Sequence, residues 1–170
     1  ALSQLCYLIS SQNVKINWGG SAIIDPKMDY NLFKKMALAG CSYLSYGLES
    51  GSQKVIDRMG KGFKIEDAQR LIRDTANAGI EVLLNIIIGF PDENEYDFLQ
   101  TMDFIKRNRD YITTIAIPSE CSIGRQTYLF SHPEEFNLEL NPEAEWQTRD
   151  GQNTHELRQR RLKIFKYFVN

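Results

Sequence analysis

Two stretches of the sequence place a glycine and an acidic side chain at the end of a strand-like apolar run. The first run covers Ser42–Leu48 and leads into Glu49-Ser50-Gly51, and the second covers Val82–Ile88 and leads into Gly89–Glu93. In proteins with parallel strands, ligands and reactive groups gather where the strands end. The repeated pattern therefore predicts an α/β enzyme whose site is built from these two strand ends.

Amphipathic helices separate the strand-like runs. Apolar residues recur at helical spacing in four segments, residues 2–9, 29–39, 65–78 and 94–105. Gly40 and Gly79 follow two of these helices, at a position where glycine commonly takes the left-handed conformation. Two further runs, Val14–Trp18 and Ile112–Ile117, also have strand character. Alternating helices and strands predict four parallel strands, adjacent in chain order and joined by helical crossovers.

The sequence after Pro118 is polar and irregular. We expect residues 1–118 to form the α/β part and residues 119–170 to add loops and helices to the same domain. A final helix is expected to begin near Thr154. It carries a basic run, for which we expect a face exposed to solvent. The run consists of Arg158, Arg160, Arg161 and Lys163.

Composition narrows the classes of function. The 170 residues include 20 basic and 22 acidic side chains, and no basic block favours a nucleic-acid partner. No apolar run is long enough to span a bilayer and no signal peptide opens the chain, so we expect a cytoplasmic protein. Cys6, Cys41 and Cys121 lie far apart, which is typical of reduced thiols and predicts no metal ligands.

Each strand end has a functional and a structural interpretation. Glu49 can accept hydrogen bonds from a ribose or an ammonium group, and Ser50 adds a hydroxyl. The structural alternative is a turn in which Ser50 or Ser52 caps the next helix. At the second strand end, Gly89 leaves room over the strand tip, and Ile87 or Ile88 can present an apolar edge to a flat base. The alternative there is a rigid strand-to-helix turn.

Other reactive side chains point to no catalytic arrangement. His132 precedes a proline in a loop, and His155 lies in the first turn of a helix. Cys121 follows the last strand, where a buried, inert thiol is the simpler interpretation. We therefore assign no catalytic residue from the sequence.

Seven short motifs follow one another over residues 14–117. They are Trp18–Ala22, Asp25–Asp29, Ala39-Gly40-Cys41, Tyr46–Ser52, Met59–Gly62, Ala78-Gly79-Ile80 and Gly89–Glu93. Each motif alone is unspecific, but the ordered set is specific. In this order and spacing the motifs resemble the radical SAM superfamily, in particular the subgroup that often carries an N-terminal cobalamin-binding domain.

The resemblance implies a partial (β/α) barrel, of which this chain is the later part, from the third strand to the sixth. It implies that S-adenosylmethionine binds at the strand ends, with Glu49 and Ser50 at its ribose and amino-acid part. Ile87 and Gly89 would lie beside the adenine, and Ile117 would contact it through its backbone. In the family, a four-iron four-sulfur cluster cleaves the cofactor reductively, and the resulting radical abstracts a substrate hydrogen.

Three departures from the family pattern limit this expectation. The cluster-binding Cys-x-x-x-Cys-x-x-Cys loop is absent from this sequence, so we expect the ligands of the cluster in a preceding part of the same protein. We also expect that these 170 residues alone are inactive. Ile23 stands where relatives often have arginine, and Asn85 replaces a frequent glycine. Cobalamin, where used, would be held by another domain.

We therefore expect the C-terminal portion of a radical SAM enzyme, with methyl transfer as one candidate reaction. Two alternatives remain open. One is a (β/α)-barrel lyase or hydrolase that uses Glu49 and Glu93 as acid and base, and the other is a non-catalytic interaction module. The expected partners are the missing N-terminal part, an unidentified substrate and a second copy paired at the exposed edge of the first strand.

Overall fold

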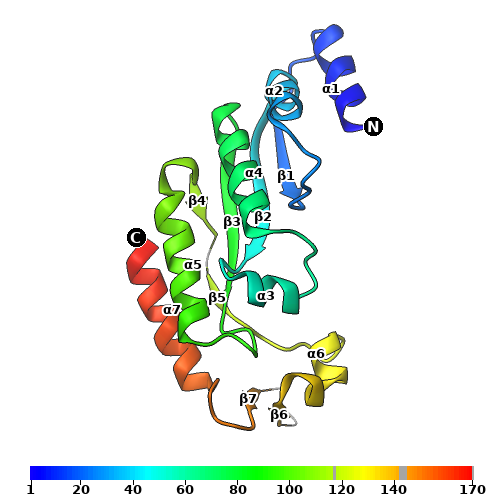
Figure 1. Ribbon diagram of the computed structural model, residues 1–170. Coiled ribbons are helices and arrows are strands. Elements are labelled where there is room, and N and C mark those ends of the chain that lie inside the picture. The colour runs from blue at the N-terminus through cyan, green and yellow to red at the C-terminus, as the bar shows by residue number, and fades with distance from the viewer. Residues whose placement is uncertain (117, 142–144, 170) are drawn as a thin grey trace. The chain divides into compact units, whose positions relative to one another are not determined.

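The computed structural model describes residues 1–116, 118–141 and 145–169, whose helices and strands are shown in Figure 1. The chain divides into two compact units. The first comprises residues 1–48, 62–85 and 105–116, and the second comprises residues 49–61, 86–104 and 117–170. Both strand ends that the sequence singles out, Glu49-Ser50-Gly51 and Gly89–Glu93, lie in the second unit.

The main sheet has the strand order β1–β2–β3–β4, and β5 also pairs with β3. β1 (Trp18–Ala22) runs parallel to β2 (Cys41–Glu49), with Gly20 opposite Leu44. β4 (Thr114–Ile115) and β5 (Ser119–Glu120) both run parallel to β3 (Glu81–Ile88). The expected order of neighbouring strands is confirmed, and with it the α/β class of a partial (β/α) barrel.

The first strand begins later in the sequence than expected. The expected strand Val14–Trp18 is wrong, because pairing with β2 starts only at Trp18, while Val14 and Ile16 are exposed. The physical reason is a close approach of β1 to β2. A Cβ atom on Gly19 would clash with the ring of Tyr43 on β2, so the pairing requires a glycine at this position. The alternation of apolar and polar residues over Val14–Trp18 therefore does not predict where β1 begins.

The last expected strand is shorter than the run Ile112–Ile117. Only Thr114–Ile115 forms β4, preceded by the 3-10 helix η1 (Arg109–Tyr111). Thr113 and Ala116 still donate backbone hydrogen bonds to β3, at 2.9 Å each, so the chain keeps its direction along the sheet on both sides of β4. Ile117 lies outside the described residues.

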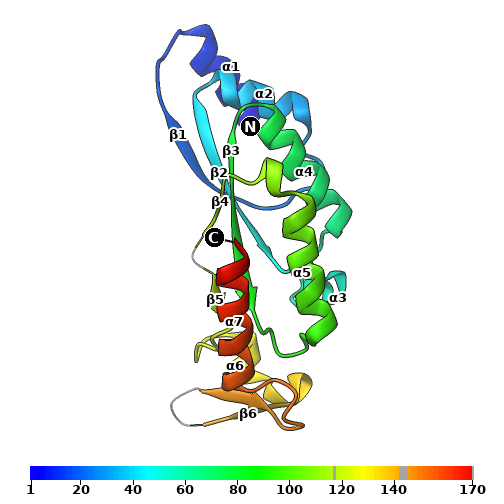
Figure 2. The same ribbon diagram turned by 90° about the vertical axis from the view of Figure 1, so that its left-hand side faces the viewer.

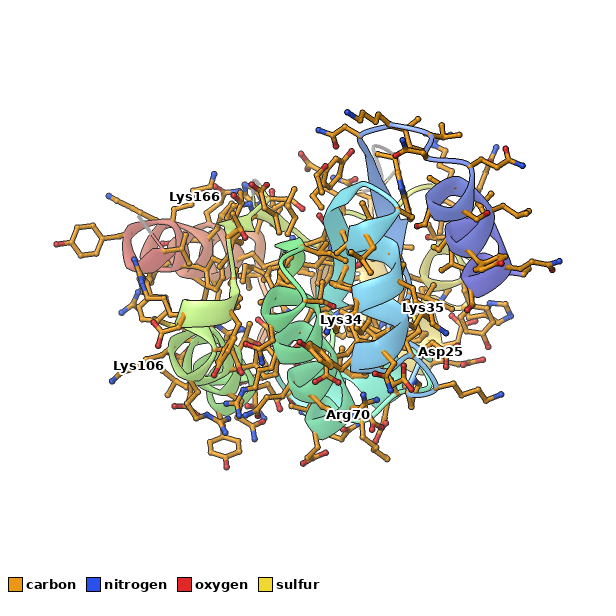
Figure 3. The ribbon with its side chains drawn as sticks, turned by 90° about the horizontal axis from the view of Figure 1, so that it is seen from above. Asp25, Lys34, Lys35, Arg70, Lys106 and Lys166 are labelled. Carbon is orange, nitrogen blue, oxygen red and sulfur yellow. The ribbon has the colours of Figure 1, made fainter. Side chains whose placement is uncertain are left out.

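Three helices of the first unit pack in sequence, α1 (Leu2–Ser11) on α2 (Tyr30–Leu38) and α2 on α4 (Ile65–Asn77), as Figure 2 shows. Arg70 lies on α4 (Figure 3). Its guanidinium donates hydrogen bonds to the carbonyl oxygens of Pro26 at 2.8 Å and Met28 at 3.0 Å. The loop before α2 is thereby held against α4.

The helix ends follow the local signals in the sequence. Asp29 caps α2, because its carboxylate accepts the backbone N–H of Leu32 at 2.8 Å. Asn94 and Asp97 cap α5 (Glu95–Arg107) reciprocally, each side chain accepting the other's backbone N–H at 3.0 Å. Gly40 and Gly79 have φ values of 86° and 85°, which confirms their expected left-handed conformation.

The second unit surrounds its own apolar core. Its shorter elements are α3 (Gln53–Arg58), α6 (Tyr128–Ser131), η2 (Pro133–Phe136) and the antiparallel pair β6 (Leu138–Leu140) and β7 (Trp146–Thr148). Its final helix, α7 (His155–Val169), packs beside β5. The core residues are Val55, Phe90, Cys121, Ile123, Phe136, Leu138 and Trp146. No helix in the part of the chain that the structure describes has the length and apolarity needed to cross a bilayer.

The basic run on the final helix does not form the expected solvent-exposed face. Arg158 and Arg161 are each only 3% exposed, whereas Arg160 and Lys163 lie on the exposed side. The expectation failed because the two buried guanidinium groups pair with carboxylates of distant segments, Glu120 and Glu93. A periodicity within one helix contains no information about such partners.

Gly51 offers a test of how tightly the end of β2 is packed. A Cβ atom at this position would lie 2.7 Å from the Cα atom of Thr101 and 2.9 Å from the carbonyl oxygen of Gln100, both on the backbone of α5. Gly51→Ala should therefore lower the free energy of unfolding by about 2 kcal/mol, measured by urea unfolding. Gly20→Ala is the control, since a Cβ there meets nothing within 4 Å. Equal stability of the two variants would contradict the packing described.

Candidate functional site

A cavity of about 540 Å³ lies in the second unit. Three parts of the chain line it. Glu49 and residues 58–61 form one side, Ile87 and Phe90 at the end of β3 form a second, and segments between residues 121 and 136 form the third. A volume of this size is typical of small-molecule sites. The structure therefore brings the two strand ends of the sequence motifs together at one cavity.

Glu49, at the end of β2, is one of two acidic side chains that line this cavity, together with Glu135. Its backbone φ is 64°, in the left-handed region that non-glycine residues seldom adopt. Such conformations cost free energy and concentrate at functional sites. The Glu49 carboxylate forms an ion pair with Lys61 Nζ at 3.1 Å, and both side chains are partly accessible. The cavity therefore offers an anion and a cation side by side.

Lys61 is a residue of this site that the sequence reasoning did not assign. Met59–Gly62 is one of the seven motifs on which the family resemblance rests, but the sequence analysis gives Lys61 no role. A lysine flanked by glycines is the signal that could have suggested one. Gly60 has a φ of 69° and open space around it, which shows how the chain turns back there. The turn brings Lys61 to Glu49 across 12 residues of sequence.

Apolar side chains line the same cavity as the charged pair. Ile87 lines the cavity from β3, and Phe90 lines it beside Phe136, with ring centroids 6.0 Å apart in an edge-to-face arrangement. The Arg58 guanidinium lies 4.2 Å from the centroid of the Phe136 ring. A flat, apolar group can pack against such a surface while its polar substituents reach Glu49 and Lys61.

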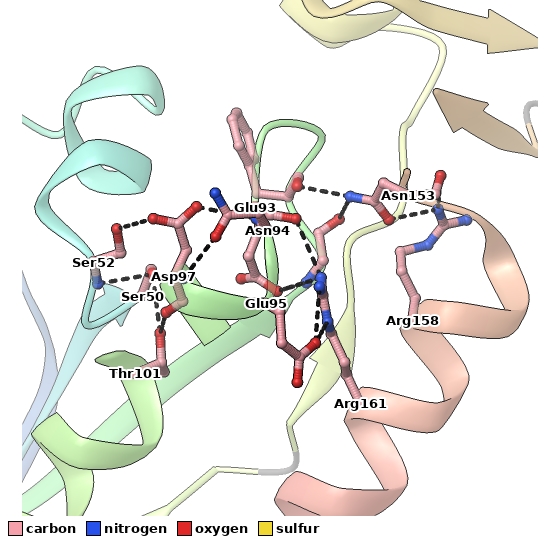
Figure 4. Close-up of polar contacts among 12 residues, drawn as sticks. Ser50, Ser52, Glu93, Asn94, Glu95, Asp97, Thr101, Asn153, Arg158 and Arg161 are labelled. Atoms are coloured by element: carbon pink, nitrogen blue, oxygen red, sulfur yellow. Dashed lines mark hydrogen bonds and ion pairs between the residues drawn. The ribbon is translucent and has the colours of Figure 1, made fainter. Parts of the chain in front are cut away.

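Ser50 does not line the cavity. It is fully buried, and its hydroxyl lies 3.1 Å from Thr101 Oγ1 while accepting the backbone N–H of Ser52 at 3.1 Å. Ser52 in turn donates to Asp97 at 2.8 Å (Figure 4). In the structure, Ser50 therefore attaches the strand end to α5. Ser52 precedes α3 without a side-chain cap hydrogen bond, so the turn is not the helix cap stated above as the alternative.

Gly89 lies at the tip of β3 with a φ of 79°. It is not among the lining residues, and its backbone N–H donates to Glu93 Oε1 at 2.9 Å. A Cβ at Gly89 would clash with the side chain of Arg158. A glycine is therefore required here because the Arg158 side chain of α7 packs against the backbone, and not because a ligand in the cavity needs the space. The predicted cofactor contact Ile117 lies outside the described residues.

Glu93 is buried, with 3% of its surface exposed, and does not line the cavity. Burial raises the pKa of its carboxyl group to about 7, although the Gly89 N–H and the Arg161 guanidinium favour the ionised form. Because only Glu49 of the two acids reaches the cavity, the structure does not support the alternative in which Glu49 and Glu93 act together as acid and base.

The cysteines do not form a metal site. Cys6, Cys41 and Cys121 are buried free thiols, and burial raises the pKa of Cys121 to about 12, which suppresses its thiolate. Within residues 1–116, 118–141 and 145–169, no three histidine, cysteine or acidic side chains gather in a metal-binding group. The described residues therefore do not fit an iron–sulfur cluster, whereas the cavity fits a small organic ligand.

The sequence matches a protein-family model and is similar to proteins of known description. Residues 20–105 match the family model of the radical SAM superfamily. A protein of Pyrococcus horikoshii described as an uncharacterized methyltransferase is 30% identical over 112 residues, which cover 65% of this chain and 24% of that protein. The chain thus spans about a quarter of the length of this relative.

Two solved structures share the fold. The radical S-adenosylmethionine methyltransferase TsrM from Kitasatospora setae, solved with cobalamin and a [4Fe-4S] cluster bound, matches with a TM-score of 0.65 and 15% identity over 82% of this chain and 30% of TsrM. The radical SAM enzyme HemN, coproporphyrinogen III oxidase from Escherichia coli, matches with a TM-score of 0.65 and 11% identity over 99% of this chain and 37% of HemN. These similarities support the partial barrel.

Glu93 gives the stability of the protein a specific pH dependence. Its pKa is raised from 4.5 to about 7 on folding, so the folded state retains a proton that the unfolded state releases between these values. The free energy of unfolding should therefore fall as the pH rises from about 4.5 to about 7, by up to about 3 kcal/mol. Glu93→Gln should remove this part of the slope in urea unfolding measured at several pH values. An identical slope in both proteins would show that Glu93 does not titrate in this range.

Proposed function

Because the chain belongs to the radical SAM superfamily, we propose that the cavity of the second unit binds S-adenosylmethionine. The observation that carries this proposal is the Glu49–Lys61 ion pair, in a cavity that Ile87 also lines and at a glutamate whose backbone is in the left-handed region. The cofactor carries a ribose diol, an ammonium, a carboxylate and a flat adenine. Each of these groups has a chemically matching side chain at the cavity.

The residues have separate roles in this proposal. Glu49 accepts hydrogen bonds from the ribose hydroxyls or the ammonium group, as the sequence motif also suggests. Lys61 binds the carboxylate, for which its ammonium is the matching charge at the cavity mouth. Ile87 and Phe90 contact the adenine ring. Binding then replaces part of the Glu49–Lys61 pair by contacts of each side chain with the ligand.

Ser50 and Gly89 support the site from behind in this proposal. Ser50 fixes the end of β2 through Thr101, and Gly89 fixes the end of β3 through Glu93. Neither residue lines the cavity, so substitutions of Ser50 or Gly89 would change ligand binding only by shifting the two strand ends. These residues thus belong to the framework that presents Glu49 and Ile87.

The proposed reaction follows the family. When bound to a reduced four-iron cluster, S-adenosylmethionine supplies one-electron chemistry that this chain's own side chains do not provide. We propose that the cluster is held by residues other than those described here. The contribution of this chain is to bind the cofactor, orient it and shield it from water.

Methyl transfer is the reaction class we favour for the whole protein. It is supported by the description of the Pyrococcus horikoshii relative as a methyltransferase and by the fold shared with TsrM. Cobalamin bound by another domain is part of the same proposal, since TsrM was solved with cobalamin. We also propose that another part of the same protein pairs with the outer edge of β1, where Ile23 is 78% exposed. Cytoplasmic localisation remains an expectation from the sequence.

Glu49 provides the direct test of the site. In the natural full-length protein, Glu49→Gln should weaken S-adenosylmethionine binding at least about tenfold, because a charge-assisted hydrogen bond is lost. Isothermal titration calorimetry measures the affinity. Glu139→Gln on the exposed face of β6 is the matched control and should bind normally. Normal binding by a folded Glu49→Gln protein would remove Glu49 from the site.

Methylthioadenosine separates the roles of the two charged residues, because it keeps the adenosine but lacks the amino-acid part. Lys61→Met should weaken S-adenosylmethionine binding about tenfold and leave methylthioadenosine binding unchanged. If Glu49 binds the ribose, Glu49→Gln should weaken both ligands. Equal loss of both ligands in Lys61→Met would contradict the role given to Lys61.

A further inference from the structure

The turn at the end of β3, residues 89–93, is held by a segment that follows more than 60 residues later. The side-chain amide of Asn153 donates hydrogen bonds to the backbone oxygens of Gly89 at 3.3 Å, Phe90 at 2.9 Å and Pro91 at 3.3 Å (Figure 4). Asn153 itself is 1% exposed, and its own backbone N–H donates to Thr148. One buried amide group therefore connects three successive carbonyl groups of the turn.

Arg161 on α7 binds the other end of the same turn. Its Nη1 atom donates to the backbone oxygen of Glu93 at 3.1 Å and lies 3.5 Å from Glu93 Oε1, while Nη2 lies 3.2 Å from Glu95 Oε2. The Glu93 carboxylate also accepts the backbone N–H of Gly89 at 2.9 Å. The guanidinium, the carboxylate and the glycine N–H thus form a continuous connection from α7 to the strand tip.

Arg158, also on α7, donates hydrogen bonds from Nη1 to the backbone oxygen of Asn153 at 3.4 Å and to its Oδ1 atom at 3.3 Å. It passes directly beside Gly89, where any Cβ atom would clash with it. Its guanidinium lies 3.7 Å from the centroid of the Trp146 ring and donates to the Trp146 carbonyl oxygen at 2.9 Å. Arg158 therefore connects the turn to the apolar core around the cavity.

Attaching a helix does not require these polar groups. Leu162 and Phe165 are buried on α7 and supply an apolar face for docking. Burying guanidinium groups costs free energy that ion pairs recover only in part. Polar groups do, however, fix positions more specifically than apolar contacts do. Asn153 and Arg161 both bind the backbone of residues 89–93, which indicates that they fix the conformation of this turn.

The turn matters because it carries part of the cavity wall. Phe90 lies within the turn and lines the cavity, and Ile87 precedes it by two residues. We propose that Asn153 and Arg161 are positioning residues that set the conformation of residues 89–93 and thereby the affinity of the cavity for S-adenosylmethionine. The second part rests on the proposed function. Neither residue lines the cavity, so both act through the turn.

The test uses the natural full-length protein and two measurements. Asn153→Ala and Arg161→Met should each lower the affinity of the folded protein for S-adenosylmethionine about tenfold, measured by calorimetry. The same variants should accelerate hydrogen exchange at the Gly89 and Glu93 amides at least about tenfold more than at amides of β2 in the first unit. Arg160→Met is the matched control, because Arg160 lies on the exposed side of α7.

A double variant covers the case in which Arg161→Met does not fold. Removing Arg161 alone leaves the buried Glu93 carboxyl without its guanidinium partner, whereas Glu93→Gln with Arg161→Met removes both charges. The double variant should therefore be more stable than Arg161→Met. It should still show fast exchange at Gly89 and weakened binding, because the connection to α7 is lost. Arg161→Lys should restore part of the affinity.

The outcomes separate the two proposals. Affinity equal to that of the natural protein in folded Asn153→Ala and Arg161→Met, or exchange accelerated uniformly across the second unit, would overturn the positioning role. If the natural protein binds no S-adenosylmethionine, the proposed function and the effect on affinity both fail. The exchange rates at Gly89 and Glu93 then still decide whether the two side chains hold the turn.

Discussion

The cavity wall at the end of β3 depends on one buried carboxyl group, that of Glu93. An acid with 3% of its surface exposed must find partners within the protein, since a buried charge or an unmet hydrogen bond is costly. The Gly89 N–H and the Arg161 guanidinium are these partners. The described residues contain no buried side-chain nitrogen or oxygen without a hydrogen-bond partner. The Glu93 carboxyl group therefore has its hydrogen-bond partners only when the tip of β3 and α7 are in these positions.

A second polar network holds the end of β2 in the same way. Ser50 bonds to Thr101, and the Gly51 N–H donates to Thr101 at 2.9 Å. Asp97 accepts from Ser52 and forms an ion pair with Lys54 at 2.7 Å, which contributes to lowering the pKa of its carboxyl group. Both strand ends are thus anchored by inward-facing polar groups. Glu49 and Ile87 are left to face the cavity, which is how the structure separates support from binding.

The predictions from sequence succeeded where the physical cause is local. The left-handed conformations of Gly40 and Gly79 were predicted from the helix ends that precede them. The caps at Asp29 and Asn94 likewise depend on neighbours within one helical turn. The pattern at the strand ends also predicted that Glu49 and the end of β3 belong to one site, and both line the cavity. The residues alone left Ile87 and Ile88 as alternatives. In the structure Ile87 lines the cavity and Ile88 is buried, because successive side chains of a strand point to opposite faces.

The predictions failed or remained incomplete where the cause lies far along the chain. Ser50 and Glu49 are adjacent in sequence and both polar, yet Thr101 on α5 draws Ser50 inward while Glu49 meets Lys61. The basic run on α7 looked solvent-exposed because its carboxylate partners are 38 and more residues away. By itself, the sequence determined the five longest helices among the described residues, the order of the first four strands and the two strand ends, since these follow from local periodicity and turn chemistry. It did not predict β5, β6 and β7, which follow Pro118. Only the tertiary structure decided which polar side chains face the cavity and which are buried behind it, because that choice is made by partners that periodicity cannot detect.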